Sequence, residues 1–339
     1  MNSIAHRFRS ARVLVVGDVM LDEYVVGTVS RICPEAPVPV LDIRSRYCSA
    51  GGAANVAMNV AGLAGTVHLV GLAGRDAAGV KLRELLRERS IPDYGLVDAG
   101  DRGTISKTRI VAGQQQICRI DHEVTTDAVG PLLDNLIEMA KGLIESCSVL
   151  VLSDYAKGAL TAGFCEVVIS YARQLNKVVI VDPKSKTFTK YRGCTLITPN
   201  VAEASLAAGV TIDSEFSLHK AGNALLDQLP GASVLITRGP DGMALFEHNS
   251  EPVLIPTVAR KLFDVVGAGD TAVATLAVAL GAGLPLREAV VWANIAAGIV
   301  VEKHGTASVS IEELFGREET ADLISNIGHG QAQGQFLSA

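Results

Sequence analysis

Residues 148–182 read SVLVLSDYAKGALTAGFCEVVISYARQLNKVVIVD and contain the pattern that decides the fold of this chain. The apolar runs at 148–153 and 177–182 lack alternating polar residues, which is typical of strands buried on both faces of a sheet. The segment between them, 163–174, predicts a helix. A strand, a helix and a second strand in this order predict parallel strands joined by a right-handed crossover.

The same alternation continues on both sides of this unit. Further helices are predicted at 52–64, 75–89, 130–145, 201–208, 215–228, 268–282 and 285–303, and further strands at 12–17, 66–71, 195–198, 233–237, 243–246 and 252–255. We therefore expect an α/β fold, a three-layer α/β/α sandwich whose sheet is mainly parallel. In such a fold, ligands bind at the edge where the strands end.

Three segments predict a second, smaller sheet. Residues 37–45, 104–112 and 115–121 alternate and carry polar residues, and Gly113 separates the last two as a hairpin turn. We expect a small β element from two separated stretches, about 23–47 and 103–122. Such an element could be a lid over a site, a dimer surface, or an extension without function.

Composition limits the classes of protein that this chain can belong to. The chain has 339 residues, 48% of them hydrophobic, and a net charge of −6, which excludes a broadly basic nucleic-acid binder. No apolar run approaches the roughly 18–20 residues of a membrane helix, and residues 1–12 lack the apolar stretch of a secretory signal. The cysteines lie singly and form no CxxC pair: Cys33, Cys48, Cys118, Cys147, Cys165 and Cys194. We expect reduced, mostly buried thiols, a cytoplasmic location, and no nucleic-acid or membrane partner.

The strongest chemical motif is DVVGAGDT at 264–271. Its glycines allow a tight turn that exposes successive N–H groups at a helix start, which is a site for anionic oxygens. Asp270 follows in the first helical turn. A carboxylate beside an anion cradle suits phosphoryl transfer to an alcohol, because it can accept the hydroxyl proton. The motif alone is equally consistent with a plain capped helix.

Three weaker motifs accompany it. AGGAAN at 50–55 permits close backbone approach and offers the Asn55 amide to sugar hydroxyls. Asp18 and Asp22 are predicted at the carboxyl end of the first strand, where acids suit hydroxyl binding. TPNVAE at 198–203 fits a capping box of Asn200 and Glu203, and also a contact with magnesium, water and phosphate.

Taken together, these motifs resemble the ribokinase family of carbohydrate kinases, also called PfkB, from about residue 12 to 310. GGAANVAMNVAGLAG resembles its N-terminal signature, DVVGAGDT its more specific C-terminal one, and NVAE its NxxE motif. Neither a GxxxxGK[ST] loop nor a GxGxxG after the first strand is present, which disfavours P-loop enzymes and dehydrogenases. The resemblance implies a ribokinase-like kinase domain over 12–316, preceded by an N-terminal extension over 1–11. Residues 317–339 are rich in Gly, Gln, Ser and Asn without periodicity, so we expect a flexible tail there.

The resemblance also implies roles for individual residues. Asp270 is the implied base, and the N–H groups of Gly267, Ala268 and Gly269 are the implied anion hole. The implied sugar-binding residues are Asp22, Gly51, Gly52 and Asn55, and the implied nucleotide-binding residues are Asn200, Glu203, Thr237, Gly239, Gly242 and Asn294. ATP is the implied co-substrate with Mg²⁺, held indirectly through Glu203. A monovalent cation, K⁺, is a further implied ligand near Asp264 and Val266.

Within the family, the segments VVGDVMLDEY, SRICPEAPVPVL, LSDYAKGAL and VDPKSKTFTKYRG resemble the branch that phosphorylates D-glycero-β-D-manno-heptose 7-phosphate at its C1 hydroxyl, in lipopolysaccharide core synthesis. Cys33 departs from the serine expected there. The resemblance is to the kinase half of a bifunctional enzyme, and because the chain ends soon after this match, we expect the stand-alone kinase form. A phosphorylated substrate needs cations, and Arg109, Lys157 and Lys184 are the first candidates, with Lys107, Arg31 and Lys186 behind them.

Two other functions stay open at this stage. A kinase of the same fold could use another sugar, sugar phosphate or nucleoside, because few side chains decide the acceptor. A non-catalytic sensor of sugar or nucleotide could retain the fold, although the acid and the glycines are intact. We also expect a homodimer formed through the small β element.

Overall fold

A computed structural model describes residues 2–259, 265–303 and 308–316 of the chain. Within them, a nine-stranded sheet has the order β13-β12-β11-β10-β9-β8-β1-β4-β5. Its strands are β1 Arg12–Gly17, β4 Thr66–Ala73, β5 Leu96–Asp98, β8 Val149–Ser153, β9 Val178–Asp182, β10 Leu196–Ile197, β11 Ser233–Thr237, β12 Met243–Phe246 and β13 Val253–Ile255. The pairs that join β12 to β11 and β13 to β12 are antiparallel, and the other pairs are parallel. The predicted α/β fold with a mainly parallel sheet is therefore confirmed.

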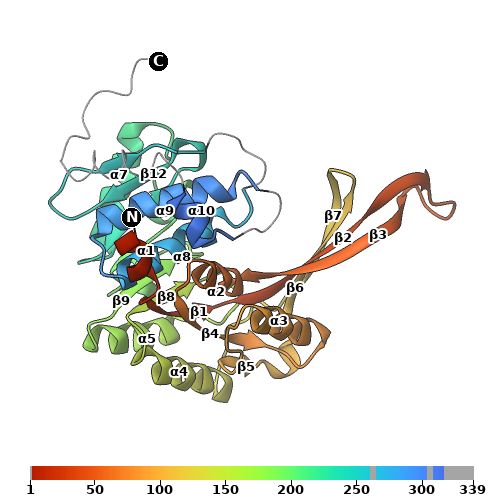
Figure 1. Cartoon of the computed structure of the whole chain (residues 1–339), viewed down its shortest axis with the longest axis horizontal. Helices are drawn as coiled ribbons and strands as arrows, with labels where there is room; N and C mark the ends of the chain where they lie inside the picture. The colour runs from red at the N-terminus through yellow and green to blue at the C-terminus, as the bar shows by residue number, and fades with distance from the viewer. Residues whose placement is uncertain (1, 260–264, 304–307, 317–339) are drawn as a thin grey trace.

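Helices cover both faces of this sheet (Figure 1). They are α1 Asn2–Phe8, α2 Ala53–Gly62, α3 Ala77–Glu88, α4 Pro131–Ile144, α5 Ala162–Gln174, α6 Val201–Ala208, α7 Glu215–Gln228, α8 Ala268–Gly281, α9 Leu286–Val300 and α10 Ile311–Phe315. Strand β1 shows how the sheet divides the core. Val13 and Val15 pack into the core layer with α2, α8 and α9, whereas Leu14 and Val16 pack into the layer with α4, α5 and α7. The period of two along a strand explains this division.

The N-terminal segment predicted as an extension belongs to this core. Phe8, the last residue of α1, is fully buried, and its ring meets the edges of the Trp292 and Phe315 rings. The first residues therefore pack on α9 and α10.

A second sheet, the lid sheet, projects from the body (Figure 1). It has the order β3-β2-β6-β7, with β2 Val19–Ile32, β3 Pro39–Gly52, β6 Ile105–Ala112 and β7 Gln115–His122. The parallel pairing of β2 with β6 joins the two predicted stretches, and Gly113 adopts φ 61° in the predicted hairpin. The sheet is longer than predicted, because β2 begins at Val19 and β3 continues to Gly52.

The carboxyl end of β1 is the point where the chain order of the sheet reverses, since β4 pairs on one side and β8 on the other. Such a switch point is where α/β sheets bind ligands. Gly17 ends β1 so close to β8 that an added Cβ would lie 2.0 Å from the Ser153 carbonyl oxygen. Gly52, with φ 57°, brings the end of β3 beside the backbone of Asp18. Because these two glycines have no side chain, the lid sheet and the large sheet can approach closely at this point.

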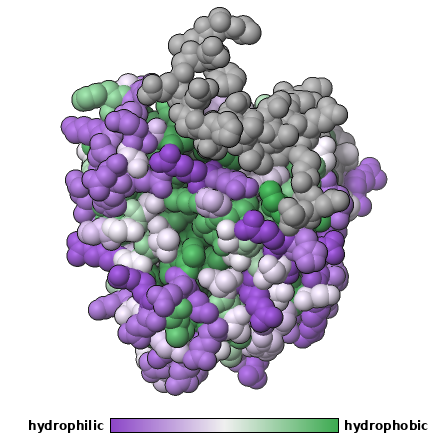
Figure 2. Space-filling model, turned by 60° about the vertical axis from the view of Figure 1, so that its left-hand side comes forward, coloured by the Kyte–Doolittle hydropathy of each residue, from purple (hydrophilic) through white to green (hydrophobic). Residues whose placement is uncertain are grey.

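Among the described residues, no helix has the length and apolar character needed to cross a membrane. The surface carries both hydrophobic and hydrophilic residues (Figure 2). On the face shown in Figure 2, hydrophobic residues gather near the middle, with hydrophilic residues around them. All six cysteines are free thiols; Cys147, Cys165 and Cys194 are buried, but Cys118 is exposed. The expectation of mostly buried thiols holds for half of them.

Candidate active site

Asp270 lies in the first turn of α8, at the bottom of a pocket beside the carboxyl ends of β9 and β11. Gly267 caps this helix in the left-handed conformation with φ 82°, which glycine adopts without strain. Burial raises the pKa of Asp270 to about 6, although hydrogen bonds from Tyr155 and Asn55 act in the opposite direction. A buried carboxyl with such a pKa can exchange a proton near neutral pH.

A chain of buried amides connects Asp270 to α2. Asn55 Nδ2 donates to Asp270 Oδ2 at 2.6 Å, and Asn59 Nδ2 donates to the backbone oxygen of Asn55 at 2.9 Å. Thr271 Oγ1 in turn donates to Asn59 Oδ1 at 2.8 Å. The Asn55 amide, predicted to bind sugar hydroxyls, thus contacts the acid itself, and the motif search missed Asn59.

The predicted anion hole lies at the start of α8. Gly267 and Gly269 line the pocket. The N–H groups of a first helical turn lack intrahelical acceptors and therefore suit an anion. The Ala268 N–H donates to the Val265 carbonyl at 3.3 Å, so in this structure that donor has an internal partner. An added Cβ at Gly269 would meet no atom within 4 Å, which leaves open space over the turn.

The same pocket contains the predicted nucleotide-side residues Asn200, Glu203 and Thr237. Asn200 and Glu203 form the predicted capping box at α6, with bonds of 2.9 and 3.0 Å. Lys184 also lines this pocket, and its Nζ lies 2.7 Å from Glu203 Oε1. Lys184 was predicted on the sugar side, but its ion partner belongs to the nucleotide-side motif. Asp182, which the motif search missed, lines the pocket as well, and burial raises the pKa of its carboxyl well above the usual value.

On the lid-sheet side, Asp22 and Arg109 form an ion pair. Arg109 Nη1 on β6 lies 2.5 Å from Asp22 Oδ1 on β2, and its guanidinium lies 5.2 Å from the ring centre of Tyr24. Gly51 permits this arrangement, since an added Cβ would lie 2.4 Å from Asp22 Oδ2. Asp22 therefore stands within the lid sheet and not at the end of β1, which corrects its predicted place: the chain stays extended after Asp18.

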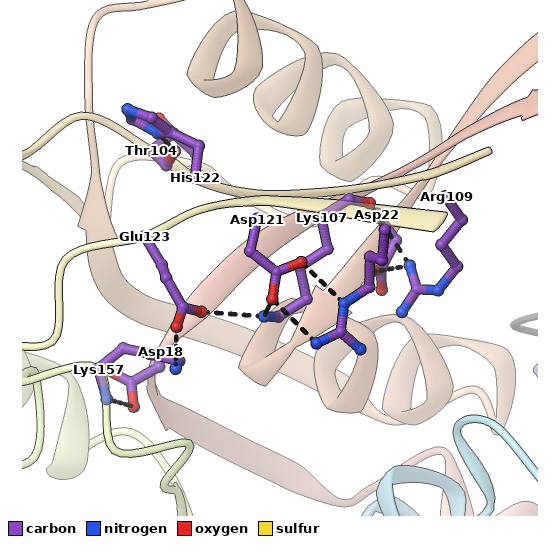
Figure 3. A network of polar contacts seen from close by, with 10 residues as sticks. Asp18, Asp22, Thr104, Lys107, Arg109, Asp121, His122, Glu123 and Lys157 are labelled. Atoms are coloured by element: carbon purple, nitrogen blue, oxygen red, sulfur yellow. Dashed lines mark hydrogen bonds and ion pairs between the residues drawn. The ribbon is translucent and has the colours of Figure 1, made fainter. Parts of the chain in front are cut away.

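Lys157 belongs to a network of charges shown in Figure 3. Its Nζ lies 2.8 Å from Glu123 Oε1, while Lys107 Nζ lies 2.9 Å from the other oxygen of Glu123 and 3.1 Å from Asp121. The Asp18 carboxylate accepts the backbone N–H groups of residues 155, 157 and 159, so in this structure it holds the loop after β8. The network joins β6, β7 and the loop after β8.

Three predicted nucleotide-side residues do not line the pocket. Gly239 and Gly242 have φ of 58° and 82° in the turn between β11 and β12, where a Cβ at Gly242 would lie 2.0 Å from the Ile255 carbonyl oxygen. Asn294 is buried in α9, and its Nδ2 donates to the Pro256 carbonyl at 2.7 Å. Of the predicted monovalent-cation site, Asp264 lies outside the described residues and Val266 is exposed.

Comparison with known proteins gives a family match over most of the chain. Residues 10–314 match the model described as pfkB family carbohydrate kinase. The protein named "Bifunctional protein HldE" from Gluconobacter oxydans is 47% identical over 308 residues, which are 91% of this chain and 64% of the relative. The protein of the same name from Granulibacter bethesdensis is 46% identical over 96% of this chain and 68% of its own length. The chain spans about two thirds of these relatives.

Solved structures with low sequence identity have the same fold. Arabidopsis thaliana ribokinase, complexed with ribose and ATP, superposes with a TM-score of 0.73 at 20% identity, over 90% of this chain and 97% of the other. Escherichia coli phosphofructokinase-2, in complex with potassium, gives 0.76 at 21% identity, over 92% and 98%. The predicted ribokinase-like three-layer fold is thereby confirmed.

Proposed function

The chain belongs to the pfkB family of carbohydrate kinases, and on that premise we propose that it transfers the γ-phosphoryl group of ATP to the C1 hydroxyl of D-glycero-β-D-manno-heptose 7-phosphate. The observation that carries the reaction type is Asp270. It is a buried acid in the first turn of α8, in the pocket that also contains Gly267, Gly269 and Glu203. A carboxylate at this position, next to backbone donors that suit a phosphoryl oxygen, supports a role as proton acceptor in phosphoryl transfer.

The proposed reaction is an in-line displacement at the γ-phosphorus. The sugar oxygen bonds to phosphorus as the bond to the bridging oxygen of ADP breaks, and Asp270 accepts the hydroxyl proton. The transition state is loose, so this proton moves late. The N–H groups of Gly267, Ala268 and Gly269 stabilise the charge on the transferred group; Ala268 must give up its contact with Val265 to take part.

The residues of the pocket also fit a magnesium ion that accompanies the nucleotide. Asp182 and Glu203 are hard oxygen donors in this one pocket, and Mg²⁺ prefers such donors together with water. The buried Asp182 carboxyl, whose pKa is raised, would be relieved by a nearby cation. The ion would neutralise charge on the phosphates. We keep K⁺ near Val266 as a prediction.

The choice of a sugar phosphate rests on cations at the lid-sheet side. Arg109, Lys157 and Lys107 are partly buried, and each is paired with an acid in this structure. A phosphate that enters between the lid sheet and the loop after β8 would exchange these carboxylate partners for its own oxygens. We propose Arg109 and Lys157 for this role, and we move Lys184 to the nucleotide side.

The heptose is proposed because of the branch-specific segments and because the relatives named HldE are 39–47% identical to this chain. The place in lipopolysaccharide core synthesis and the cytoplasmic location belong to the same proposal. An acceptor panel of the heptose 7-phosphate, fructose 6-phosphate, ribose and adenosine tests it. ADP release is measured, and the product is identified by phosphorus NMR.

A new anomeric phosphate on the heptose alone is the expected result. Turnover with a different acceptor would contradict the substrate while leaving the kinase reaction in place. Tight ATP binding with no turnover would contradict the reaction and favour the sensor.

A further inference from the structure

The phenol of Tyr155 contacts the proposed base directly. Its Oη donates a hydrogen bond to Asp270 Oδ1 at 2.7 Å, while Asn55 Nδ2 donates to Oδ2. Tyr155 lines the pocket, and it comes from the loop after β8, 115 residues before Asp270. Each carboxylate oxygen can accept two hydrogen bonds, so Asp270 still has acceptor capacity for a substrate hydroxyl.

The loop that carries Tyr155 is firmly held. Asp18 accepts the N–H groups of Tyr155, Lys157 and Ala159 at 2.9, 3.0 and 3.1 Å. Ala156 adopts φ 55°, a conformation that is uncommon for a side chain of its kind, and its N–H donates to Asp154 Oδ1 at 2.7 Å. The backbone from which the Tyr155 side chain reaches Asp270 is therefore fixed by several hydrogen bonds.

Two nearby acids oppose a negative charge on Asp270. Asp22 on β2 acts on the Asp270 carboxyl through its charge, and Asp270 acts in the same way on Asp182 at the end of β9. Burial adds to this opposition. Tyr155 from the loop and Asn55 from α2 are the two groups that donate to its carboxylate in the described part of the chain. Hydrogen bonds to the charged form favour that form.

We infer that Tyr155 is a positioning residue for the transfer reaction: its phenol orients the Asp270 carboxylate and keeps it in the ionised form that accepts the substrate proton. This inference rests on the proposed function, because it takes Asp270 as the base. Tyr155 keeps its own proton throughout, since burial and the nearby carboxylates raise the pKa of the phenol well above its usual value. The proton of the sugar hydroxyl ends on Asp270.

The test is the pH dependence of kcat/KM in Tyr155→Phe, which removes only the hydroxyl. Loss of the donor raises the pKa of Asp270, so the acidic limb of the profile should move up by about one pH unit. Starting from a pKa of about 6, a move of about one unit lowers kcat/KM about five-fold at pH 6 and by less than about 1.2-fold at pH 8. The matched control is Tyr171→Phe, which removes the hydroxyl of a half-buried tyrosine that donates to Glu145 Oε1 at 2.7 Å and does not line the pocket.

A second variant should move the acidic limb in the opposite direction, and it keeps the hydrogen bond to Asp270. A fluorinated tyrosine at position 155 is a stronger donor and should move the acidic limb to lower pH. Opposite shifts in the two variants, with none in Tyr171→Phe, support the inference. The inference about Tyr155 is overturned if the acidic limb stays in place in both Tyr155 variants. The proposed function then stands, provided that the wild type turns over and Asp270→Asn does not. No turnover by the wild type overturns both.

Discussion

Asp270 is the side chain on which the proposed reaction depends. General bases contribute about 10²–10⁴-fold to rate, so Asp270→Asn should lower kcat by at least that factor. ATP binding should survive, because the nucleotide-side residues are unchanged. The measurement is kcat by ADP release together with the ATP dissociation constant by calorimetry. Asp134→Asn, on the exposed surface of α4, is the control. Full activity in Asp270→Asn would contradict the assignment.

A substitution at Arg109 tests binding of the sugar phosphate independently of binding of the nucleotide. Arg109→Ala removes the cation proposed for the substrate phosphate and leaves the buried Asp22 without its partner. We expect the KM for the sugar phosphate to rise by about ten-fold or more, with the KM for ATP little changed. Arg119→Ala, which removes the neighbouring and exposed guanidinium on β7, is the matched control. Equal effects on both KM values would show that Arg109 has a structural role.

At this scale, local motifs predict residues whose neighbours in sequence define their task. Asp270 and Gly267 were predicted because a glycine turn before an acid at a helix start is visible in eight residues. Tyr155 and Asn59 were missed, because each meets its partner only after distant elements pack. Asn55 was predicted as a site residue because it belongs to the same short motif as Gly52. Its contact with Asp270 joins residues 215 positions apart, and no local motif predicts such a contact.

Among the elements, α3 and β6 are tied together by one carboxylate. Asp76 caps α3 by accepting the Gly79 N–H at 2.8 Å, and it also accepts the Thr104 N–H at 2.7 Å just before β6. Asp76→Ala should lower the free energy of unfolding by about 2–4 kcal/mol, from the lost cap and the lost charged hydrogen bond. Chemical denaturation at pH 7 measures this difference.

The same side chain predicts a pH dependence. Burial opposes ionisation of Asp76, but the backbone hydrogen bonds from Thr104 and Gly79 lower its pKa overall below the usual value. The stabilisation is therefore present above the unfolded-state pKa of about 3.9 and is lost as pH falls through the lower folded-state pKa. The gap between wild type and Asp76→Ala should shrink below about pH 4. A gap that is constant across this range would contradict the role of the charge.

The predicted boundaries of several elements agree with the structure, but those of the long strands β2 and β3 do not. The hairpin of β6 and β7 and the helices α6 and α7 lie within one residue of the predicted ranges. Strand β5, with three residues, is too short to show a period, and α1 was hidden in a basic segment. The early start of β2 was missed because Asp18 interrupts an otherwise extended chain that turns into the lid sheet directly after β1.

At the scale of the whole molecule, the lid sheet is the surface through which we propose that two chains associate. It projects from the body (Figure 1) and exposes large apolar side chains, among them Ile43 at 48% and Ile120 at 58%. Ile43→Glu should convert the proposed dimer to a monomer, because an unpaired charge would be buried in the interface. Light scattering after size exclusion measures the mass. The control is Phe216→Glu. Phe216 lies in the first turn of α7 and is 81% exposed, so this change should leave the dimer intact. A wild-type monomer, or an unaltered Ile43→Glu dimer, would contradict the proposal.

The layering of the molecule was predictable, because continuous apolar strands between helices permit few arrangements. How the lid sheet meets the body was not, since it depends on the parallel pairing of β2 with β6, whose first residues are 86 positions apart. Pairings of this kind leave no periodic mark in the sequence.

The amide chain between α2 and α8 also constrains the order in which the protein can become active. A ribosome completes Asn55 and Asn59 more than two hundred residues before Asp270 and Thr271. Until then the Asn55 amide has no Asp270 carboxylate to donate to, although Asn59 can already donate to the backbone oxygen of Asn55. Contacts so distant in sequence form late and slowly. On the proposed function, catalytic competence therefore waits for the segment that forms α8, and a chain that stops before Asp270 would lack its proton acceptor.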